Sequence, residues 1–165
     1  MRLAYVLIAL CAFAGMELFA WATHRYLMHG RWGWGWHASH HVEPIGGGHE
    51  RRGFELNDLF AVVFAAPAVL LFWLGSHPGW GAATAAAVGV TGYGVMYGVV
   101  HDGLVHHRWP FRLTPRRGYA KRLVQAHRLH HSTLGREGAV SFGFLYAPEV
   151  RKLKALLQRR GVDAG

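Results

Sequence analysis

The sequence predicts an all-α integral membrane protein with about three to four transmembrane helices and a histidine-rich helical cap on the cytoplasmic side. Hydrophobic residues make up 52% of its 165 residues and charged residues only 16%, which is low for a soluble protein. Three apolar stretches each approach the length of about 20 residues that a helix needs to cross a bilayer. Ten of the 13 histidines fall in four clusters beside these stretches.

The predicted membrane spans lie near residues 3–22, 57–76 and 79–100, within a single domain of residues 1–165. The first contains one charge, Glu17, and the apolar parts of the other two contain none. The first stretch also resembles a secretory signal peptide, because Arg2 precedes an apolar core. Its length and its direct continuation into His24 favour a retained helix.

The distribution of positive charge predicts the orientation. With three spans, residues 23–56 and 101–165 lie on the same side of the membrane and form the predicted cap. They contain 17 of the 18 lysines and arginines, so this side is expected to be cytoplasmic and the location to be the inner membrane. The net charge of +9 is therefore expected to reflect membrane topology, with the basic residues beside a lipid bilayer. We expect no nucleic-acid partner.

Shorter patterns predict the remaining elements. Asn57 or Asp58 is a candidate N-cap for the second span. Gly94 and Gly98 have the GxxxG spacing of closely packed helices, or alternatively leave a groove for a lipid-like substrate. Residues 118–131 are expected to form a basic helix, and residues 148–160 a second, amphipathic one with a proline in its first turn.

The histidines follow one pattern twice: a pair five residues apart, then His-x-x-His-His. The ten residues are His24, His29, His37, His40, His41, His101, His106, His127, His130 and His131. On a helix, positions i, i+3 and i+4 share a face, so each triad is expected to converge on one point. Positions i and i+5 are about 140° apart on an α-helix, so each pair is expected at a frayed helix end or a π-bulge.

Ten imidazoles at one membrane face favour a metal centre. Neutral buried rings need partners and protonated ones repel each other, and ten ligands exceed what one ion holds, so two ions are expected. Imidazole binds iron, zinc, copper and nickel alike. The single cysteine, Cys11, excludes a thiolate site. Asp102 is either an acceptor for a ligand N–H or a helix-end charge. Glu17 is costly in a membrane and needs a partner on another helix.

Three histidines lie outside the pattern, and we expect no metal-binding role for them: His49, His77 and His107.

The chain resembles the bacterial beta-carotene 3-hydroxylases of the membrane fatty acid hydroxylase and sterol desaturase superfamily. The resemblance is carried by "HRYLMHG", "WGWHASHH", "VVHDGLVHHRWPFR" and "GREGAVSFGFLYAP". It implies a non-haem di-iron monooxygenase that uses O2 and hydroxylates β-ionone rings, giving zeaxanthin through cryptoxanthin, with all ten histidines as ligands. It also implies a carotenoid substrate in the membrane and an external, ferredoxin-type electron donor. Zinc is a possible replacement metal in a purified sample.

Two other functions share these features. A hydroxylase or desaturase of another lipid, such as a fatty acid or sterol, has the same metal site. A non-enzymatic metal-binding or metal-transport protein is the alternative from a different class, but it requires ligands along a path through the membrane. Here the histidines gather at one end of the spans.

Overall fold

The computed structural model describes residues 2–42, 54–110 and 113–162, and every regular element in these ranges is a helix. The elements are α1 (Arg2–Ala22), the π-helix η1 (Thr23–Met28), α2 (Trp34–Val42), the 3-10 helix η2 (Leu56–Leu59), α3 (Phe60–Gly75), α4 (Gly81–Tyr97), the π-helix η3 (Gly98–Val105), α5 (Gly118–His130) and α6 (Val150–Arg159). Residues 43–53, which include His49, lie outside the described residues.

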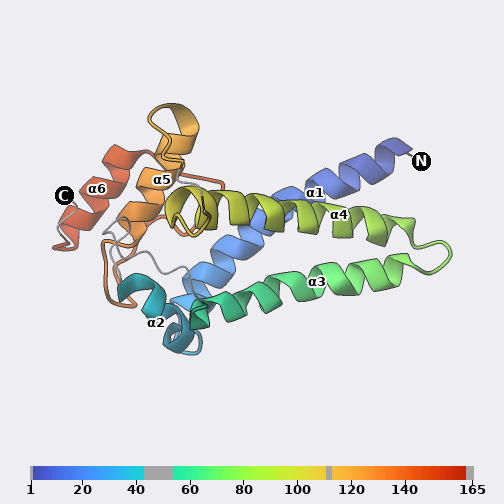
Figure 1. Cartoon of the computed structure of the whole chain (residues 1–165), viewed down its shortest axis with the longest axis horizontal. Helices are drawn as coiled ribbons and strands as arrows, with labels where there is room; N and C mark the ends of the chain where they lie inside the picture. The colour runs from blue at the N-terminus through green and yellow to red at the C-terminus, as the bar shows by residue number, and fades with distance from the viewer. Residues whose placement is uncertain (1, 43–53, 111–112, 163–165) are drawn as a thin grey trace.

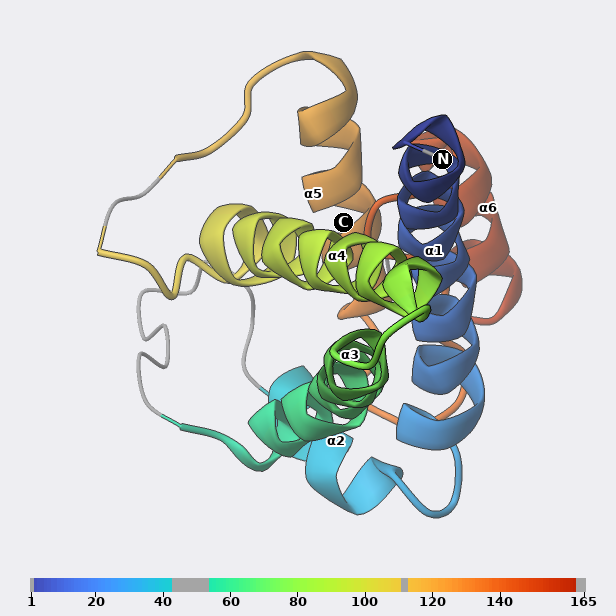
Figure 2. The ribbon, with the colours of Figure 1, turned by 90° about the vertical axis from the view of Figure 1, so that its right-hand side faces the viewer.

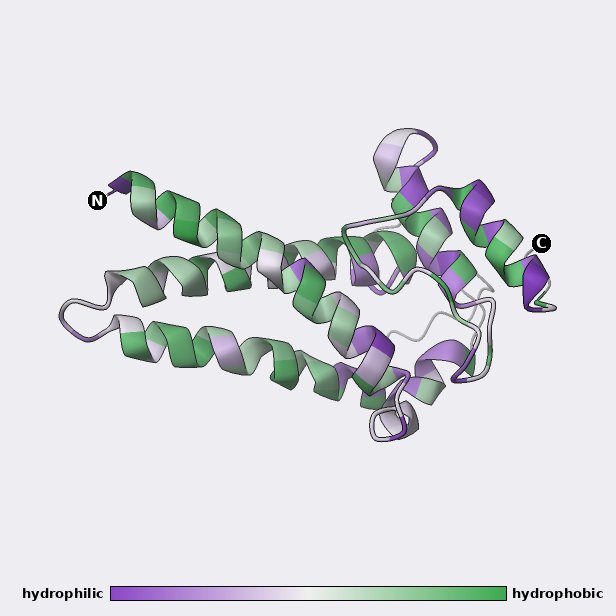
Figure 3. Cartoon of the chain, turned by 180° about the vertical axis from the view of Figure 1, so that it is seen from behind, coloured by the Kyte–Doolittle hydropathy of each residue, from purple (hydrophilic) through white to green (hydrophobic). Residues whose placement is uncertain are grey.

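Three helical stretches are long and apolar enough to cross a membrane: Arg2–Met28, Leu56–Gly75 and Gly81–Val105. In Figure 1 the N-terminus and the α3–α4 turn lie at one end of these helices, and α2, α5 and α6 lie at the other. Hydrophobic residues cover the long helices, and hydrophilic residues concentrate at the end that carries α5 and α6 (Figure 3). The predicted all-α membrane fold, with three spans and a helical cap, is therefore confirmed.

The central helix α4 packs against both α1 and α3, as the end-on view in Figure 2 shows. The close approach of α1 to α4 depends on Gly89, because a Cβ there would collide with the backbone oxygen of Ala9. The predicted GxxxG packing is wrong: a Cβ at Gly94 or Gly98 would meet no atom within 4 Å. The space beside Gly94 instead agrees with the alternative prediction, a groove for a lipid-like substrate.

Both histidine pairs lie where an α-helix widens into a π-helix. The N–H of His29 donates to the carbonyl of His24 at 3.0 Å, and the N–H of His106 donates to that of His101 at 2.9 Å. Each i to i+5 bond brings its two rings to nearly the same face, with ring centroids 5.3 Å and 4.5 Å apart. Of the two predicted alternatives, a frayed helix end or a π-bulge, the structure has the π-helical one at both pairs.

Two helix starts differ from the predictions. The second span begins with η2, whose N-cap is Glu55 rather than Asn57 or Asp58. Glu55 and Asp58 form a reciprocal capping box, in which each side chain satisfies a backbone N–H of the other residue. At the second cap helix, Pro148 precedes the N-cap Glu149 instead of lying in the first turn.

The cap has a small core of its own between α5, α6 and the chain that joins them. Its buried members are Ala126, Leu129, Val140, Ala147, Leu153 and Leu157. The joining segment contains no regular secondary structure over residues 133–149. Its backbone N–H and C=O groups are therefore free to bind side chains, which is how this segment reaches the histidines.

Candidate metal centre

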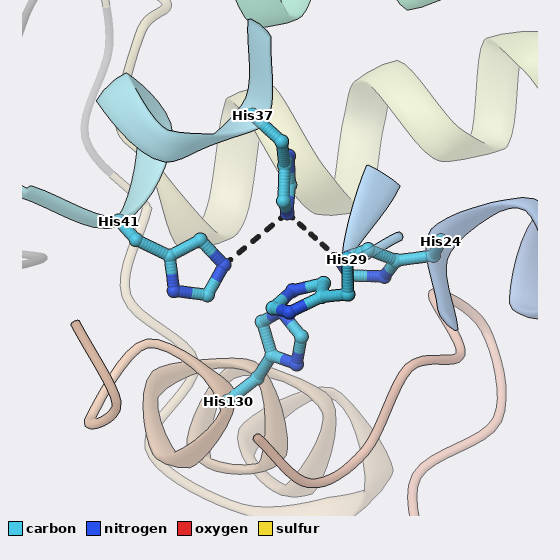
Figure 4. A group of neighbouring side chains, drawn as sticks. All are labelled: His24, His29, His37, His41 and His130. Carbon is cyan, nitrogen blue, oxygen red and sulfur yellow. Dashed lines mark hydrogen bonds between the residues drawn. The ribbon is translucent and has the colours of Figure 1, made fainter. Parts of the chain in front are cut away.

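Nine of the ten predicted histidines form two compact groups, within each of which one nitrogen per residue lies within 4.8 Å of the others. The first group draws residues from η1, α2 and α5 (Figure 4). Its members are His24, His29, His37, His41 and His130. The second group contains His40, His106, His127 and His131.

The tenth histidine, His101, lies beside the second group. Its Nε2 atom is 3.1 Å from Nε2 of His40, and its ring centroid is 4.9 Å from that of His127. With His101 counted in the second group, each group receives one π-helical pair. The two copies of the sequence pattern thus make equivalent contributions.

The prediction that each His-x-x-His-His triad converges on one point is wrong, because the structure divides both triads. His37 and His41 of α2 belong to the first group, whereas His40 belongs to the second. In α5 the division is reversed: His127 and His131 belong to the second group and His130 to the first. Positions i+3 and i+4 project to opposite sides of position i, since 3.6 residues make one turn, so one triad can serve two neighbouring points.

The Nδ1 atoms of the first group are held by oxygen acceptors. The Nδ1–H groups of His24 and His130 donate to the carbonyls of Phe142 and Val140 at 3.0 Å and 2.9 Å. Those of His29 and His41 donate to backbone carbonyls of Arg136 and Thr133, and that of His37 to Oδ1 of Asn57 at 2.6 Å. Because these oxygens only accept, each Nδ1 carries the hydrogen, and each Nε2 presents a lone pair.

These Nε2 lone pairs face one another at short range. Nε2 of His37 is 3.2 Å from Nε2 of both His24 and His41, the contacts drawn as dashed lines in Figure 4. Nε2 of His29 is 3.1 Å from Nε2 of His130. Two lone pairs cannot form a hydrogen bond, so a cation between them is needed to make the arrangement favourable. Metal–nitrogen bonds of about 2.1 Å place neighbouring ligand atoms about 3.0–3.4 Å apart, which fits these separations.

Two histidines at the second group, His40 and His101, have carboxylate acceptors. The Nδ1–H of His101 donates to Asp102 at 2.8 Å, which agrees with the acceptor role predicted for Asp102. The Nδ1 of His40 lies 3.3 Å from Glu55. A carboxylate partner makes an imidazole ligand more basic than a carbonyl partner does. These two rings are therefore more basic than rings held by a backbone carbonyl.

Arg108 joins the carboxylates behind the second group. Its guanidinium donates to both oxygens of Asp58, at 2.6 Å and 2.7 Å, and lies 3.5 Å from Glu55 and 3.9 Å from Asp102. The hydrogen bonds to Asp58 raise the pKa of Arg108. Burial alone would raise the pKa of Glu55, but His40 and Arg108 outweigh it and lower that pKa, so the carboxylate remains ionised.

Burial keeps the cap histidines neutral. Loss of hydration, followed by repulsion from neighbouring rings, lowers the pKa of His37, His106, His127, His130 and His131. Burial also lowers the pKa of His41 to about 3. A neutral imidazole is the form that binds a metal. The ring nitrogens are therefore ready to act as ligands at neutral pH.

The remaining predicted residues lie apart from the two groups. His77 is exposed in the α3–α4 turn at the opposite end of the spans. His107 is buried but offers no atom to either group. Glu17 touches no histidine; it binds Tyr93 of α4, as the expected partner on another helix, together with backbone N–H groups of residues 144–146.

Three residues around the histidines were not predicted from the sequence: Asn57 and Glu55, which contact histidine Nδ1 atoms, and Arg108, which binds the carboxylates. Asn57 and Glu55 both lie in the "ELND" motif. In this motif Glu55 stands three positions before Asp58, which is the spacing of a capping box. Arg108 lies two residues after His106, but nothing in the sequence relates it to Asp58, 50 residues earlier.

An apolar groove leads from the membrane helices to the second group. The cavity measures about 620 Å³ and lies between α3 and α4, with Met16 of α1 at its side. Its apolar walls include Phe64 and Phe72, and Gly94 widens it. Its polar end is formed by Asn57, His101, Asp102 and Arg108, together with Asp58. A long apolar molecule in this groove would have one end beside the histidines.

Comparisons with known proteins agree with this geometry. The family model described as fatty acid hydroxylase matches residues 9–147. The chain is 56% identical over 161 residues to a protein of Pantoea ananas named beta-carotene hydroxylase, covering 96% of this chain and 87% of that protein. A Paracoccus protein of the same name is 55% identical over 147 residues, covering 89% and 86%. A Haematococcus lacustris protein, named beta-carotene 3-hydroxylase, chloroplastic, is 41% identical over 82% of this chain and 41% of its own length. No solved structure matches. The matched residues include all ten histidines of the centre and the helices that carry them, and the chain belongs to the fatty acid hydroxylase family.

Proposed function

We propose that the protein is a beta-carotene 3-hydroxylase with two iron ions bound by the ten histidines. It adds a hydroxyl group at C3 of each β-ionone ring and converts β-carotene through cryptoxanthin to zeaxanthin. Each step consumes one O2, two electrons and two protons, and yields one hydroxyl group and one water molecule. The names of the similar proteins support this substrate.

The observation that carries the proposal is the position of the groove relative to the histidines. The groove is apolar between α3 and α4 and ends at His101. A carotenoid is a long hydrocarbon dissolved in the bilayer, so it can enter between the helices and bring its ring to the histidines. A metal-transport protein would instead need ligands along the spans.

Each part of the chain has a distinct task in this proposal. Two iron ions would supply the activation of O2 that hydroxylation of an unactivated C–H bond requires. The Nδ1 acceptors of the first group hold its five Nε2 atoms toward the space where an ion would bind, and Arg108 offsets part of the negative charge of Glu55, Asp58 and Asp102. Phe64 and Phe72 exclude water from the hydrocarbon part. The product hydroxyl is more stable at the polar end than between the spans.

The charge distribution supports an inner-membrane location with the histidines at the cytoplasmic face, because the positively charged segments lie at that end. Electrons would then come from a soluble, ferredoxin-type donor in the cytoplasm. The chain's single cysteine provides no iron–sulfur site of its own.

The experiment is expression in cells that make β-carotene, under ¹⁸O2. Zeaxanthin with one labelled oxygen in each hydroxyl group is expected. Label from water in place of O2 would contradict the oxygenase reaction. Unchanged β-carotene together with hydroxylated fatty acid or sterol would assign the protein to another lipid.

A further inference from the structure

We infer that Glu17, a carboxylate within the first membrane helix, is a positioning residue for the first histidine group. It acts by anchoring the loop of residues 139–147, here called the cap loop. This inference rests on the proposed two-metal function but concerns the protein's own residues.

The carboxylate of Glu17 is surrounded by hydrogen-bond donors. Its oxygens accept the backbone N–H groups of Phe144 at 3.0 Å, Leu145 at 3.0 Å and Tyr146 at 2.9 Å, and the hydroxyl group of Tyr93 at 2.7 Å. Three consecutive N–H groups form a concave anion-binding surface. These bonds compensate the cost of a charge in the membrane helix, and they fix the position of the cap loop.

The same loop holds two ligands of the first group. The carbonyls of Val140 and Phe142 accept the Nδ1–H groups of His130 and His24. The ring of Phe144 stacks on His24, with centroids 5.0 Å apart and planes inclined by 14°. In the described part of the chain, the oxygen acceptors at the second group are Glu55 and Asp102, which lie outside the cap loop.

The loop backbone needs an external anchor. Ser141, between the two carbonyls, has φ of 58°, a left-handed conformation that is strained for a non-glycine residue. Such a conformation persists where surrounding contacts hold it. Gly143 lets the carboxylate approach, because a Cβ there would lie 2.6 Å from Oε1 of Glu17.

Two substitutions break the anchor in different ways. Glu17→Gln removes the charge and places an NH2 group against backbone donors. Gly143→Ala keeps the carboxylate but forces it away from the loop. The two variants should have similar effects, and the double variant should be little worse than either. Tyr93→Phe is the matched control, since it removes one hydrogen bond and leaves the three backbone bonds in place.

The test uses the full-length, metal-free protein in lipid nanodiscs, titrated with Co²⁺. His41→Ala and His131→Ala identify which binding phase belongs to which group. Loss of a residue that orients a ligand typically weakens metal binding 10–100-fold. Glu17→Gln and Gly143→Ala should therefore weaken Co²⁺ at the first group at least about 10-fold. The second group should change less than about threefold, and Tyr93→Phe should stay within that limit at both groups.

Amide hydrogen exchange on the same samples is the second readout. Exchange at residues 144–146 should accelerate in Glu17→Gln and Gly143→Ala. Equal weakening at both groups, or unchanged exchange at these amides, would overturn the inference. If the unmodified protein bound no Co²⁺, the two-metal function would fail, whereas the exchange measurement would still decide whether Glu17 anchors the loop.

Discussion

The ion pair between Arg108 and Asp58 should be a major contributor to the stability of the cap. Arg108→Met removes two charge-assisted hydrogen bonds of 2.6 Å and 2.7 Å, each worth about 1.5–3 kcal/mol where water is excluded. The side chains of Arg108 and Asp58 are 17% and 22% exposed. The pair therefore falls between an exposed one, worth at most about 1 kcal/mol, and a fully buried one, whose disruption costs about 3–5 kcal/mol.

A double-mutant cycle of Arg108→Met and Asp58→Ala isolates this pair. The cycle cancels the loss of the bond from Asp58 to the N–H of Glu55, because that loss occurs in both variants that lack Asp58. We expect a coupling energy of about 2 kcal/mol in the free energy of unfolding, measured by equilibrium unfolding in mixed micelles. Lys152→Met, which breaks an exposed pair with Glu149, should cost less than about 0.5 kcal/mol. A coupling energy between Arg108 and Asp58 below about 0.5 kcal/mol, the upper limit expected for the surface pair, would refute the reasoning.

Three further predictions concern the metal site and the groove. His41→Ala and His131→Ala should each remove one of two bound ions and abolish hydroxylation, whereas His77→Ala should change neither; metal analysis and product assays check this. Gly94→Leu should lower carotenoid turnover at least about tenfold by filling the groove without loss of metal, and Gly15→Leu, which also has open space, should not; normal turnover in Gly94→Leu would place the substrate elsewhere. In the metal-free protein, stability should fall as the pH drops from 6.5 toward 3, because unfolded His41 binds a proton that the folded residue, with its pKa of about 3, does not. A slope of up to about 1.4 kcal/mol per pH unit is expected for this residue alone, and stability independent of pH in this range would contradict its burial as a neutral ring.

The sequence predicted the features that depend on residue type and local periodicity. Apolar length located the three spans, and the five-residue spacing of His24 and His29 predicted a π-bulge because an α-helix would separate their rings. The number of spans placed both histidine copies at one end. These are short-range properties, and they remain the same whatever the helices pack against.

The features that the sequence did not predict depend on contacts between distant segments. The acceptors for His24 and His130 are backbone carbonyls, which every residue has, so no residue type marks them. Asn57 was a candidate helix cap, but its side chain accepts a hydrogen bond from His37, and Glu55 is the N-cap. The spacing of Gly94 and Gly98 is typical of close helix packing, and only the position of α3 shows that Gly94 lines a groove.

In the proposed two-metal centre, the division of the two triads lets short helices hold two ions. A single α-helical face can direct positions i and i+4 to one ion, but position i+3 then points to the other side. In α2 this residue is His40, and it joins the group supplied mainly by η3 and α5; in α5 it is His130, and it joins the group supplied mainly by η1 and α2. Each copy of the pattern therefore contributes one histidine to the other copy's ion. Neither group is complete without both copies. In the proposed function, α2 and α5 must therefore be in place before either ion would have its full set of ligands, and metal binding would be coupled to assembly of the cap on the membrane helices.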